Sequence, residues 1–509
     1  MLQYFFASEV KGKSTKKLFN NLAIAKELEC MEHQGQYPVI FISFKDIKEL
    51  TFASTINGLL DLVKDLYTEW SNILLTSDKI NKADQCLIED TLQQNLSEDK
   101  LKRALKNLVN MVATATGQQV YILIDEYDTP IQEAYIRGYY DQLIVFMRGF
   151  LSGPLKDNTS VKQSILTGIL RVSKESLFSG LSNLEIYSIL DQKYCNYFGF
   201  TENEVNDLLI KVGLPTTTNQ TKEWYNGYNF GNTTIYNPWS IIKFIKGNGD
   251  LKSYWVNTSG NELVKDLIIN SSYNIQEDIA GLIAGKTIQK NIDEHIVFND
   301  LKNNPESIWS LLLMSGYLKY LSYERKGRRY VCKLKLPNNE VEDFYTSVVE
   351  DWLIGDRGSN WYKEFIDSLA NGKVAEFEEM LQRFVEETLS FHDVTKKQQE
   401  YVYHSLLLGF TAGLKGTHFI TSNRESGEGR YDVLIVPKDI NRLGIIMEFK
   451  AVKNKKQLGS AAKEALNQIK KLKYSTELQA RGISHMCHMG ISFSGKSLKI
   501  ISDSPKTYL

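Results

Sequence analysis

The chain has 509 residues, and its 60 basic and 61 acidic side chains leave a formal net charge of −1. This length is too great for one ordinary core and predicts about three domains, since a domain commonly holds about 100–200 residues. Without a positive excess over the whole chain, the composition does not indicate a nucleic-acid-binding protein, although a local basic patch remains compatible with it.

Five cysteines are spread along the chain and form no CxxC pair: Cys30, Cys86, Cys195, Cys332 and Cys487. An odd, dispersed set disfavours disulfide and zinc frameworks and favours a reducing cytoplasm. The first residues lack the pattern of a signal peptide, and no apolar run approaches the roughly 20 residues that span a membrane. We therefore expect a cytoplasmic protein with no membrane partner, and the sequence does not indicate an oligomeric state.

The first part of the chain alternates strand and helix patterns. Residues 39–44 predict a buried strand, residues 121–126 an apolar strand whose tip carries two acids, and residues 164–170 a further strand. Residues 53–74 and 97–118 have the period and length of amphipathic helices, the second with Ser97 as its N-cap. Because strands that alternate with helices commonly pair in parallel, we expect a parallel α/β sheet.

Beyond about residue 200 the pattern becomes mostly helical, with a β-hairpin predicted at residues 316–337. Residues 224–239 are dense in aromatic side chains and Asn-Gly turns, and we expect them to pack between the α/β part and the helical part. Stacking of these rings on nucleic-acid bases is the alternative. From about residue 395 the pattern changes to one helix, three strands, one helix and a strand.

The strand at residues 121–124 is followed by two carboxylates, Asp125 and Glu126. P-loop nucleotidases place acids at such a strand end, where the first holds Mg²⁺ beside the phosphates and the second polarises the attacking water. The alternative is an ordinary solvated strand end, since many parallel strands end in acids.

A P-loop enzyme also needs the motif GxxxxGK[ST], whose backbone N–H groups surround the phosphates. The segment Gly12-Lys13-Ser14-Thr15 offers only the second half of this motif, because Ala7 stands where the first glycine belongs. We interpret this segment as an exposed turn between two helices.

Several sequence segments, spread over essentially the whole chain, resemble those of a known family. They are LFNNLAIA with HQGQYPVIFISFKDIK, VYILIDEYDTPI, ILTGILRVSKESLFSGLSNL, WYNGYNFG with YNPWSI, and SNRESGEGRYDV with IMEFK. In these segments and their order, the chain resembles the prokaryotic AAA-ATPase-like proteins that end in a PD-(D/E)xK nuclease-like domain. The resemblance implies that Asp125 and Glu126 are Walker B acids of a P-loop NTPase and that Arg171 occupies a sensor-like position.

In that family the Walker A lysine loop lies just upstream of a helix like MLQYFF, with which this sequence begins. Relative to the family, the chain looks truncated before the phosphate loop. We expect it to bind ATP weakly or not at all, because that loop and its lysine supply most of the binding energy for a triphosphate.

Near the C-terminus, residues 430–437 and 443–450 predict two strands joined by a turn at residues 438–442. A hairpin symmetric about Ile440 places Asp432 directly opposite Glu448. Directly opposed side chains point to the same face, and Lys450, two residues after Glu448, shares that face. The sequence therefore predicts two acids and a lysine at one end of an apolar hairpin face.

Two adjacent carboxylates repel each other unless a cation lies between them. Oxygen ligands with several waters suit Mg²⁺ or Mn²⁺, and such an ion polarises a phosphodiester and lowers the pKa of a bound water. A lysine beside the ion can orient or deprotonate that water and stabilise the transition state. The alternative is a surface hairpin whose charges pair as a salt-bridge ladder.

The elements around this hairpin favour the metal site. A helix at residues 398–416 and a strand at 417–423 precede it, and a helix at 457–474 and a strand at 488–493 follow it. This αβββαβ order resembles the core of the PD-(D/E)xK, or restriction-endonuclease-like, nucleases. The resemblance carries Asp432, Glu448 and Lys450 over as catalytic residues.

The same resemblance implies that Glu400 helps to hold the metal and that Gln468 is a polar residue accompanying the catalytic core. For both residues the alternative is an ordinary helix position. The loop at residues 424–430, with two glycines and two arginines, either approaches a phosphate backbone or forms a flexible turn. His485 and His488 lie three residues apart between methionines, which favours a packed strand over a zinc site.

We predict three parts: an AAA-ATPase-like α/β domain without its phosphate loop at residues 1–245, a mainly helical linker at 246–393, and a PD-(D/E)xK nuclease-like domain at 394–509. The predicted function is Mg²⁺-dependent hydrolysis of phosphodiester bonds in DNA or RNA. Two alternatives stay open: a catalytically inactive interaction or regulatory protein of the same descent, and an ATP-gated regulator if an upstream in-frame GxxxxGK[ST] restores the phosphate loop.

Overall fold

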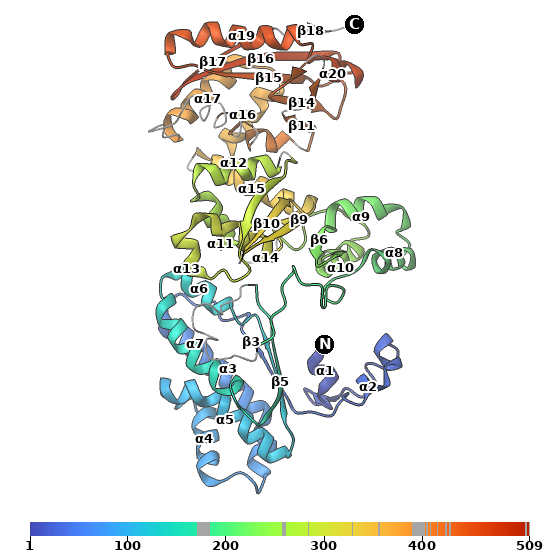
Figure 1. The fold of residues 1–509 in the computed structure, drawn as a ribbon, viewed down its shortest axis with the longest axis vertical. Coiled ribbons are helices and arrows are strands. Elements are labelled where there is room, and N and C mark those ends of the chain that lie inside the picture. Colours follow the sequence, from blue (N-terminus) through green and yellow to red (C-terminus); the bar gives the residue numbers. More distant parts are fainter. Residues whose placement is uncertain are drawn as a thin grey trace. The chain divides into compact units, whose positions relative to one another are not determined.

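The computed structural model describes residues 1–169, 184–256, 261–283, 285–327, 329–354, 357–388, 403, 406–407, 409–414, 416–422, 425–426, 429–503 and 506–507. Its contacts divide into two compact units, Met1–Ser188 with Asp293–Ser315, and Ile189–Ile292 with Gly316–Leu509 (Figure 1). Residues 293–315, within the predicted linker, thus belong to the first unit. The predicted domain boundaries near residues 245 and 393 stay predictions.

A parallel sheet of three strands, in the order β3–β4–β5, forms the centre of the first unit. The strands are Val39–Ser43, Val120–Asp125 and Val161–Leu166. The expected parallel α/β sheet is therefore confirmed. The third strand begins three residues before its predicted start and ends at Leu166, and the predicted end at residue 170 lies outside the described residues.

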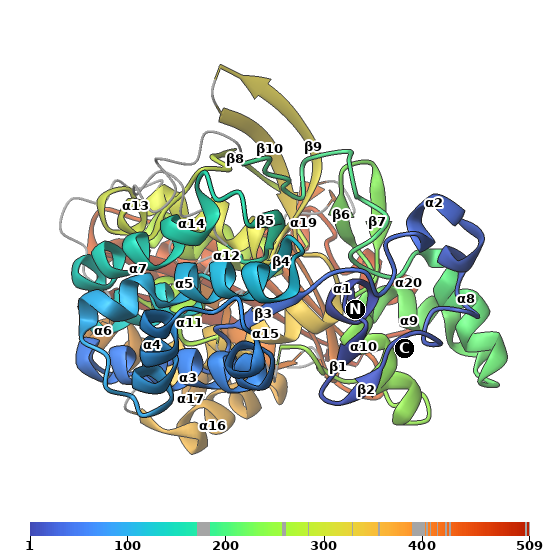
Figure 2. The same ribbon diagram turned by 90° about the horizontal axis from the view of Figure 1, so that it is seen from below.

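The two faces of this sheet have different covers. Figure 2 shows α3 (Phe52–Thr76), α5 (Glu98–Thr116) and α7 (Tyr140–Leu155) on one side and α1 (Leu2–Phe6) on the other. The helix predicted from residue 97 begins as expected, since the Ser97 side chain accepts a hydrogen bond from the Lys100 N–H. The remaining helices of this unit include α4 (Lys82–Leu92), α6 (Thr129–Arg137), α13 (Phe298–Asn303) and α14 (Ile308–Met314).

The segment Gly12–Thr15 lies between α1 and α2 (Leu28–Met31), as predicted, and its exposed turn belongs to a β-hairpin that was not predicted. Strands β1 (Glu9–Val10) and β2 (Lys13–Ser14) pair through a two-residue turn at Lys11 and Gly12, whose φ angles are 51° and 73°. Two successive positive φ angles match the twist of a tight hairpin. The following Thr15 is buried and donates its hydroxyl to the Ala7 carbonyl at 2.5 Å, which ties the hairpin to the end of α1.

The middle of the chain belongs mostly to the second unit and combines helices with small antiparallel sheets. The hairpin predicted at residues 316–337 is confirmed as β9 (Lys319–Lys326) and β10 (Arg329–Lys335), and β8 (Ile288–Ile292) adds an unpredicted third strand. Its helices are α8 (Glu202–Lys211), α9 (Thr218–Tyr225), α10 (Pro238–Lys246), α11 (Glu262–Ile269), α12 (Tyr273–Ile283), α15 (Asn339–Ile354), α16 (Ser359–Ala370) and α17 (Val374–Thr388).

The aromatic segment at residues 224–239 packs mainly into this helical part. Tyr225 and Tyr236 are buried among side chains of α8, α9 and α10, and the short hairpin β6–β7 (Tyr228–Phe230 and Thr233–Ile235) lies between them in sequence. The Asn229 amide donates to the Tyr320 carbonyl of β9 at 2.6 Å. Trp239 departs from the expected burial, because it is 45% exposed and carries the Lys243 ammonium 4.7 Å from its ring centre.

A sheet of six strands ends the chain. It follows the order β11–β14–β15–β16–β17, with β18 also paired to β16. The strands are His418–Ser422, Val433–Pro437, Gly444–Ala451, His485–Ser494, Ser497–Ser502 and Lys506–Thr507. Strands β15 and β16 are parallel and are joined through α19 (Leu458–Lys471), so the predicted order of strands and second helix is confirmed.

Three features of this region were not predicted. Strands β17 and β18 extend the sheet, and the short helix α20 (Thr476–Ala480) follows α19. Where a loop was expected at residues 424–430, β12 (Glu425–Ser426) and β13 (Gly429–Arg430) form a small hairpin. Only part of the predicted helix at residues 398–416 is described, and there Tyr403 is buried and stacks on Phe493.

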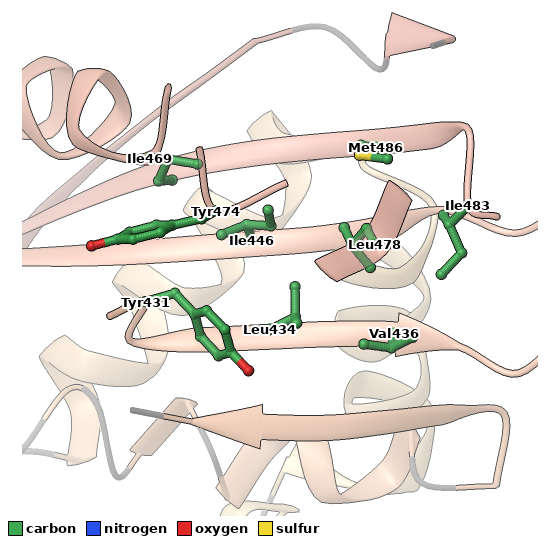
Figure 3. Packing of buried hydrophobic residues seen from close by; sticks show 9 residues of the cluster. All are labelled: Tyr431, Leu434, Val436, Ile446, Ile469, Tyr474, Leu478, Ile483 and Met486. Atoms are coloured by element: carbon green, nitrogen blue, oxygen red, sulfur yellow. The ribbon is translucent and has the colours of Figure 1, made fainter. Parts of the chain in front are cut away.

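One face of the C-terminal sheet packs against α19 and the chain that follows it. Figure 3 shows Ile469, Tyr474 and Leu478 clustered with side chains of β14 and β15, among them Leu434 and Ile446. The helix comes so close to β16 that a Cβ on Gly490 would lie 2.1 Å from the Ala462 carbonyl oxygen. Glycine at this position therefore permits the helix to lie directly over the strand. Figure 1 shows α16 and α17 on the other side of the sheet.

Among the described residues, no helix combines the length and the apolar character that a membrane span requires.

Candidate functional site at the end of β15

The β14–β15 hairpin has the predicted register. Val433 pairs with Met447, and Ile435 pairs with Ile445, so the hairpin is symmetric about Ile440. The connecting turn is organised by Asp439, whose side-chain oxygen accepts the Asn441 N–H at 3.0 Å. This short turn fixes the register of the two strands, whose residues are almost all buried.

Asp432 immediately precedes β14, next to the strand that carries Glu448. Its Oδ2 accepts a hydrogen bond from the Phe449 N–H at 2.7 Å. The carboxylate thus supplies an acceptor for a β15 N–H beyond Met447, the last β15 residue paired with β14. The structure therefore places the Asp432 carboxylate beside the backbone that immediately follows Glu448.

Glu448 and Lys450 both contact α19. The buried Glu448 accepts a hydrogen bond from the Gln468 amide. The Lys450 ammonium pairs with Glu464 at 2.6 Å, and the side chains are 27% and 70% exposed, respectively. Since Glu464 and Gln468 are one helical turn apart, they extend from the same side of α19. Glu448 and Lys450 consequently point to the same face of the sheet, as their spacing predicted.

Asp125 and Glu126 lie at the carboxyl end of β4, as predicted, and their described partners come from nearby turns. Asp125 accepts the Thr167 hydroxyl proton at 2.5 Å, just after β5. Glu126 has a φ of 51° and accepts from the Thr129 hydroxyl at 3.3 Å. Arg171 lies outside the described residues, so its predicted sensor position is not placed.

The buried Asp128 makes a second connection between the ends of β4 and β5. Its carboxylate accepts the Ile169 N–H at 2.8 Å. A Cβ on Gly168 would lie 2.7 Å from the Asp128 oxygen, so this close approach depends on glycine. Together with the bond between Thr167 and Asp125, this contact holds the two strand ends side by side.

In addition to the segment Gly12–Thr15, a formal match to GxxxxGK[ST] lies at Gly490 to Ser497. The local fold of this segment excludes a phosphate-binding role. Gly490 lies inside β16, and Gly495 and Lys496 form the tight turn between β16 and β17. A phosphate loop requires a strand, a loop and then a helix N-terminus, whereas this segment continues from strand to strand.

Comparison with known families agrees with this architecture. Residues 1–178 match a family described as a predicted AAA-ATPase, and residues 398–503 match the PD-(D/E)XK nuclease superfamily. The chain joins an AAA-ATPase-like domain to a PD-(D/E)XK nuclease domain. In the nuclease domain, Asp432, Glu448 and Lys450 lie at the end of the central hairpin, and in the AAA-ATPase-like domain Asp125 and Glu126 lie at the end of β4.

A relative from Azotobacter chroococcum mcd 1, described as an uncharacterized protein in the vnfD 5′ region, is 27% identical over 237 residues. The match covers 46% of this chain and 43% of the relative. The chain therefore matches less than half of that protein's length.

The donor set of the nuclease domain fits a hard divalent cation. Mg²⁺ is commonly held by one or two carboxylates together with several waters, and each carboxylate can accept about four hydrogen bonds or metal contacts. Within the described part of the chain, no group of three or more His, Cys, Asp or Glu side chains gathers around a common point, and the predicted third ligand, Glu400, lies outside it.

Two residues near the predicted sites escaped the sequence analysis. Glu464 pairs with Lys450. It lies one helical turn before Gln468 on α19, and these two residues contact two residues of β15, Lys450 and Glu448, that also lie on one face. Thr167 immediately follows β5 and donates its hydroxyl to Asp125. The one-turn spacing of Glu464 and Gln468 on the predicted helix could have suggested Glu464. Thr167 could not be predicted without knowing where β5 ends.

Proposed function

We propose that the PD-(D/E)XK domain hydrolyses phosphodiester bonds in nucleic acid with Mg²⁺ or Mn²⁺. The observation that carries this proposal is the hairpin register, which brings Asp432 beside the end of β15 and turns Glu448 and Lys450 to one face. A bound ion would supply Lewis-acid polarisation of the phosphodiester and a water of lowered pKa. Asp432 and Glu448 would hold it, with Glu400 as a further ligand.

The other side chains have separate roles in this proposal. Gln468 orients Glu448 through their hydrogen bond, and fixed outer partners of this kind keep a metal-binding carboxylate in one geometry. Lys450 orients or deprotonates the attacking water and stabilises the negative charge that develops on the phosphate. Without substrate, Lys450 pairs with Glu464. A substrate phosphate would compete with Glu464 for the Lys450 ammonium.

A local cluster of positive charge supports a nucleic-acid substrate in spite of the nearly neutral chain. Lys450 is followed by three exposed lysines before the start of α19: Lys453, Lys455 and Lys456. Such a cluster attracts a phosphate backbone without reading its sequence, so either DNA or RNA satisfies it. We place this activity in the cytoplasm, on the same cysteine argument as above, and all five cysteines are free thiols.

The decisive experiment is a cleavage assay on a mixture of single- and double-stranded DNA and RNA, with Mg²⁺ or Mn²⁺ and with EDTA. We expect cleavage that EDTA abolishes and that Lys450→Ala removes. Lys471→Ala, which changes an exposed lysine at the end of α19, is the charge-matched control and should cleave normally. Equal residual cleavage by the wild type and Lys450→Ala would show a contaminant and would favour the inactive-descendant alternative.

A further inference from the structure

A buried histidine of β16 links two side chains that the proposed nuclease chemistry does not use. His488 Nδ1 lies 2.8 Å from Asp503 Oδ2, and its Nε2 lies 2.9 Å from Ser475 Oγ. The side chains of His488 and Asp503 are 3% and 8% exposed, whereas Ser475 is only partly buried. Small molecules therefore reach this network most readily at the serine.

The three residues are held in place from separate elements. Ser475 immediately precedes α20 and follows Tyr474, which is buried in the cluster drawn in Figure 3. Asp503 follows β17, and its Oδ1 accepts the His488 N–H at 2.9 Å. The carboxylate thus binds both the ring and the backbone of His488, which restricts the orientation of the imidazole.

The chemistry of the groups assigns the protons. An ionised carboxylate only accepts hydrogen bonds, so Nδ1 of His488 donates to Asp503. In the neutral imidazole Nε2 is then the acceptor, and the Ser475 hydroxyl donates to it. Burial alone would raise the pKa of Asp503, but hydrogen bonds from the His488 ring and backbone, together with the charge of Lys470, hold this pKa below its ordinary value. The carboxylate is therefore ionised at neutral pH.

We propose that Ser475, His488 and Asp503 form a nucleophilic serine site for carboxylic acid esters. A serine hydroxyl that donates to a histidine base, with a buried carboxylate orienting that base, activates serine for acyl transfer on several unrelated folds, and the arrangement is recognised by geometry and not by chain order. In this chain the site lies in the PD-(D/E)XK domain and is independent of Asp432, Glu448 and Lys450.

The reaction proceeds in two balanced steps. In the first, the Ser475 hydroxyl proton moves to His488 Nε2, Oγ bonds to the ester carbonyl carbon, and the ester C–O bond breaks as the leaving alcohol takes the proton from Nε2. In the second, a solvent water gives a proton to Nε2 and attacks the acyl carbon, and Ser475 regains its proton as the acid leaves. No electrons are gained or lost, and the products are one acid and one alcohol.

The test uses the full chain and a biotinylated fluorophosphonate, which reacts with activated serines. We expect one adduct per chain, mapped to Ser475 by peptide mass spectrometry, and none in Ser475→Ala. Labelling of His488→Gln should be slower by about 10²-fold or more, since a positioned general base contributes at least that much. A burst of p-nitrophenol from p-nitrophenyl acetate should follow the same order among the variants.

The matched control is Ser460→Ala, because Ser460 is an exposed serine of α19 that donates to the Gln457 carbonyl at 2.9 Å. It should be labelled like the wild type. Thermal melts followed by circular dichroism establish which variants are folded, and Asp503→Asn replaces His488→Gln if the latter does not fold. The proposal is overturned if the folded wild type forms no adduct at Ser475, or if a folded His488→Gln or Asp503→Asn protein is labelled at the wild-type rate.

Discussion

Two strand ends of this chain carry neighbouring acids, and the side chains around them differ in origin. At the end of β4, Asp125 and Asp128 bond a hydroxyl and a backbone N–H from the segment that follows β5. At the end of β15, Glu448 and Lys450 bond an amide and a carboxylate from α19, a helix that crosses the sheet.

The difference shows why acids at a strand end do not by themselves identify a site. The contacts at β4 tie two neighbouring strands of one sheet together. The contacts at β15 join Glu448 and Lys450 to side chains of α19 on one face, where we propose that a divalent ion and a phosphate bind. We therefore expect substitutions at the two strand ends to have different consequences.

The largest expected effects are on cleavage. Asp432→Ala and Glu448→Ala should lose metal binding at the site, and each should lower kcat/KM by about 10²–10³-fold or more, because charge stabilisation in the transition state disappears. Lys450→Ala should lose cleavage to a similar extent while still binding Mn²⁺. Titration calorimetry with Mn²⁺ and single-turnover cleavage measure the two properties separately.

Asp125→Ala is the comparison for this first prediction, since it removes an acid from the other strand end. Its cleavage and Mn²⁺ binding should match the wild type. The contrast between the strand ends fails if Asp125→Ala abolishes cleavage while Glu448→Ala retains it.

The next effect concerns the close approach of α19 to β16. In Gly490→Ala, the new Cβ would meet backbone atoms of Ala462 and Leu466 at 2.1 and 2.5 Å, so the helix must move away from the strand. We expect the free energy of unfolding to fall by about 1–3 kcal/mol, as in other overpacked cores. Urea denaturation measures the change.

Gly459→Ala is the matched control on α19, because a Cβ there meets no atom within 4 Å. Replacing a helical glycine by alanine should leave the free energy of unfolding unchanged or raise it by up to about 1 kcal/mol. A Gly490→Ala protein as stable as Gly459→Ala would contradict the close packing of helix and strand.

Smaller effects are expected from the two α19 side chains that contact β15. Gln468→Leu should weaken Mn²⁺ binding by about 10–100-fold, the usual consequence of losing a partner that orients a metal ligand. Glu464→Gln should instead raise kcat/KM by less than about tenfold, because a partly exposed ion pair with Lys450 is weak and its loss frees the ammonium for phosphate. An Mn²⁺ affinity that stays unchanged in Gln468→Leu would remove Gln468 from the proposed site.

The smallest expected effect is in ATP binding. We predict that calorimetry of this 509-residue chain with Mg-ATP shows no binding in the low micromolar range, since the GxxxxGK[ST] match at residues 490–497 lies in a strand and a tight turn. Lys496→Ala should change nothing in this experiment. Tight binding that Asp125→Ala removes would contradict the prediction and restore the ATP-gated alternative.

Local patterns in the sequence determined the elements and the hairpin register. Ser97 begins α5 as a capping side chain, and the apolar runs of β3, β4 and β15 lie where the sequence predicted them. The pairing of β14 with β15 was also predictable, because the length of a hairpin turn fixes the register of the strands that it joins. These features depend on residues that are close neighbours along the chain.

Short motifs carry no information about the elements that surround them. Gly12–Thr15 lies between two helices as expected, but it forms part of a hairpin, whose turn has positive φ at Lys11 and Gly12. The motif at residues 490–497 satisfies the phosphate-loop pattern, yet it continues from β16 to β17. In both cases the neighbouring elements, and not the motif, decide what its glycines and lysine do.

Only the tertiary structure decided which distant side chains meet. Gln468 and Glu464 reach Glu448 and Lys450 because α19 lies directly over β15 and β16, an approach that Gly490 permits. Ser475, His488 and Asp503 come from three elements and meet only when α20, β16 and β17 are assembled. Contacts of this kind depend on how a helix axis lies across a sheet, and that placement results from the packing of many buried side chains whose individual patterns specify only which face is apolar.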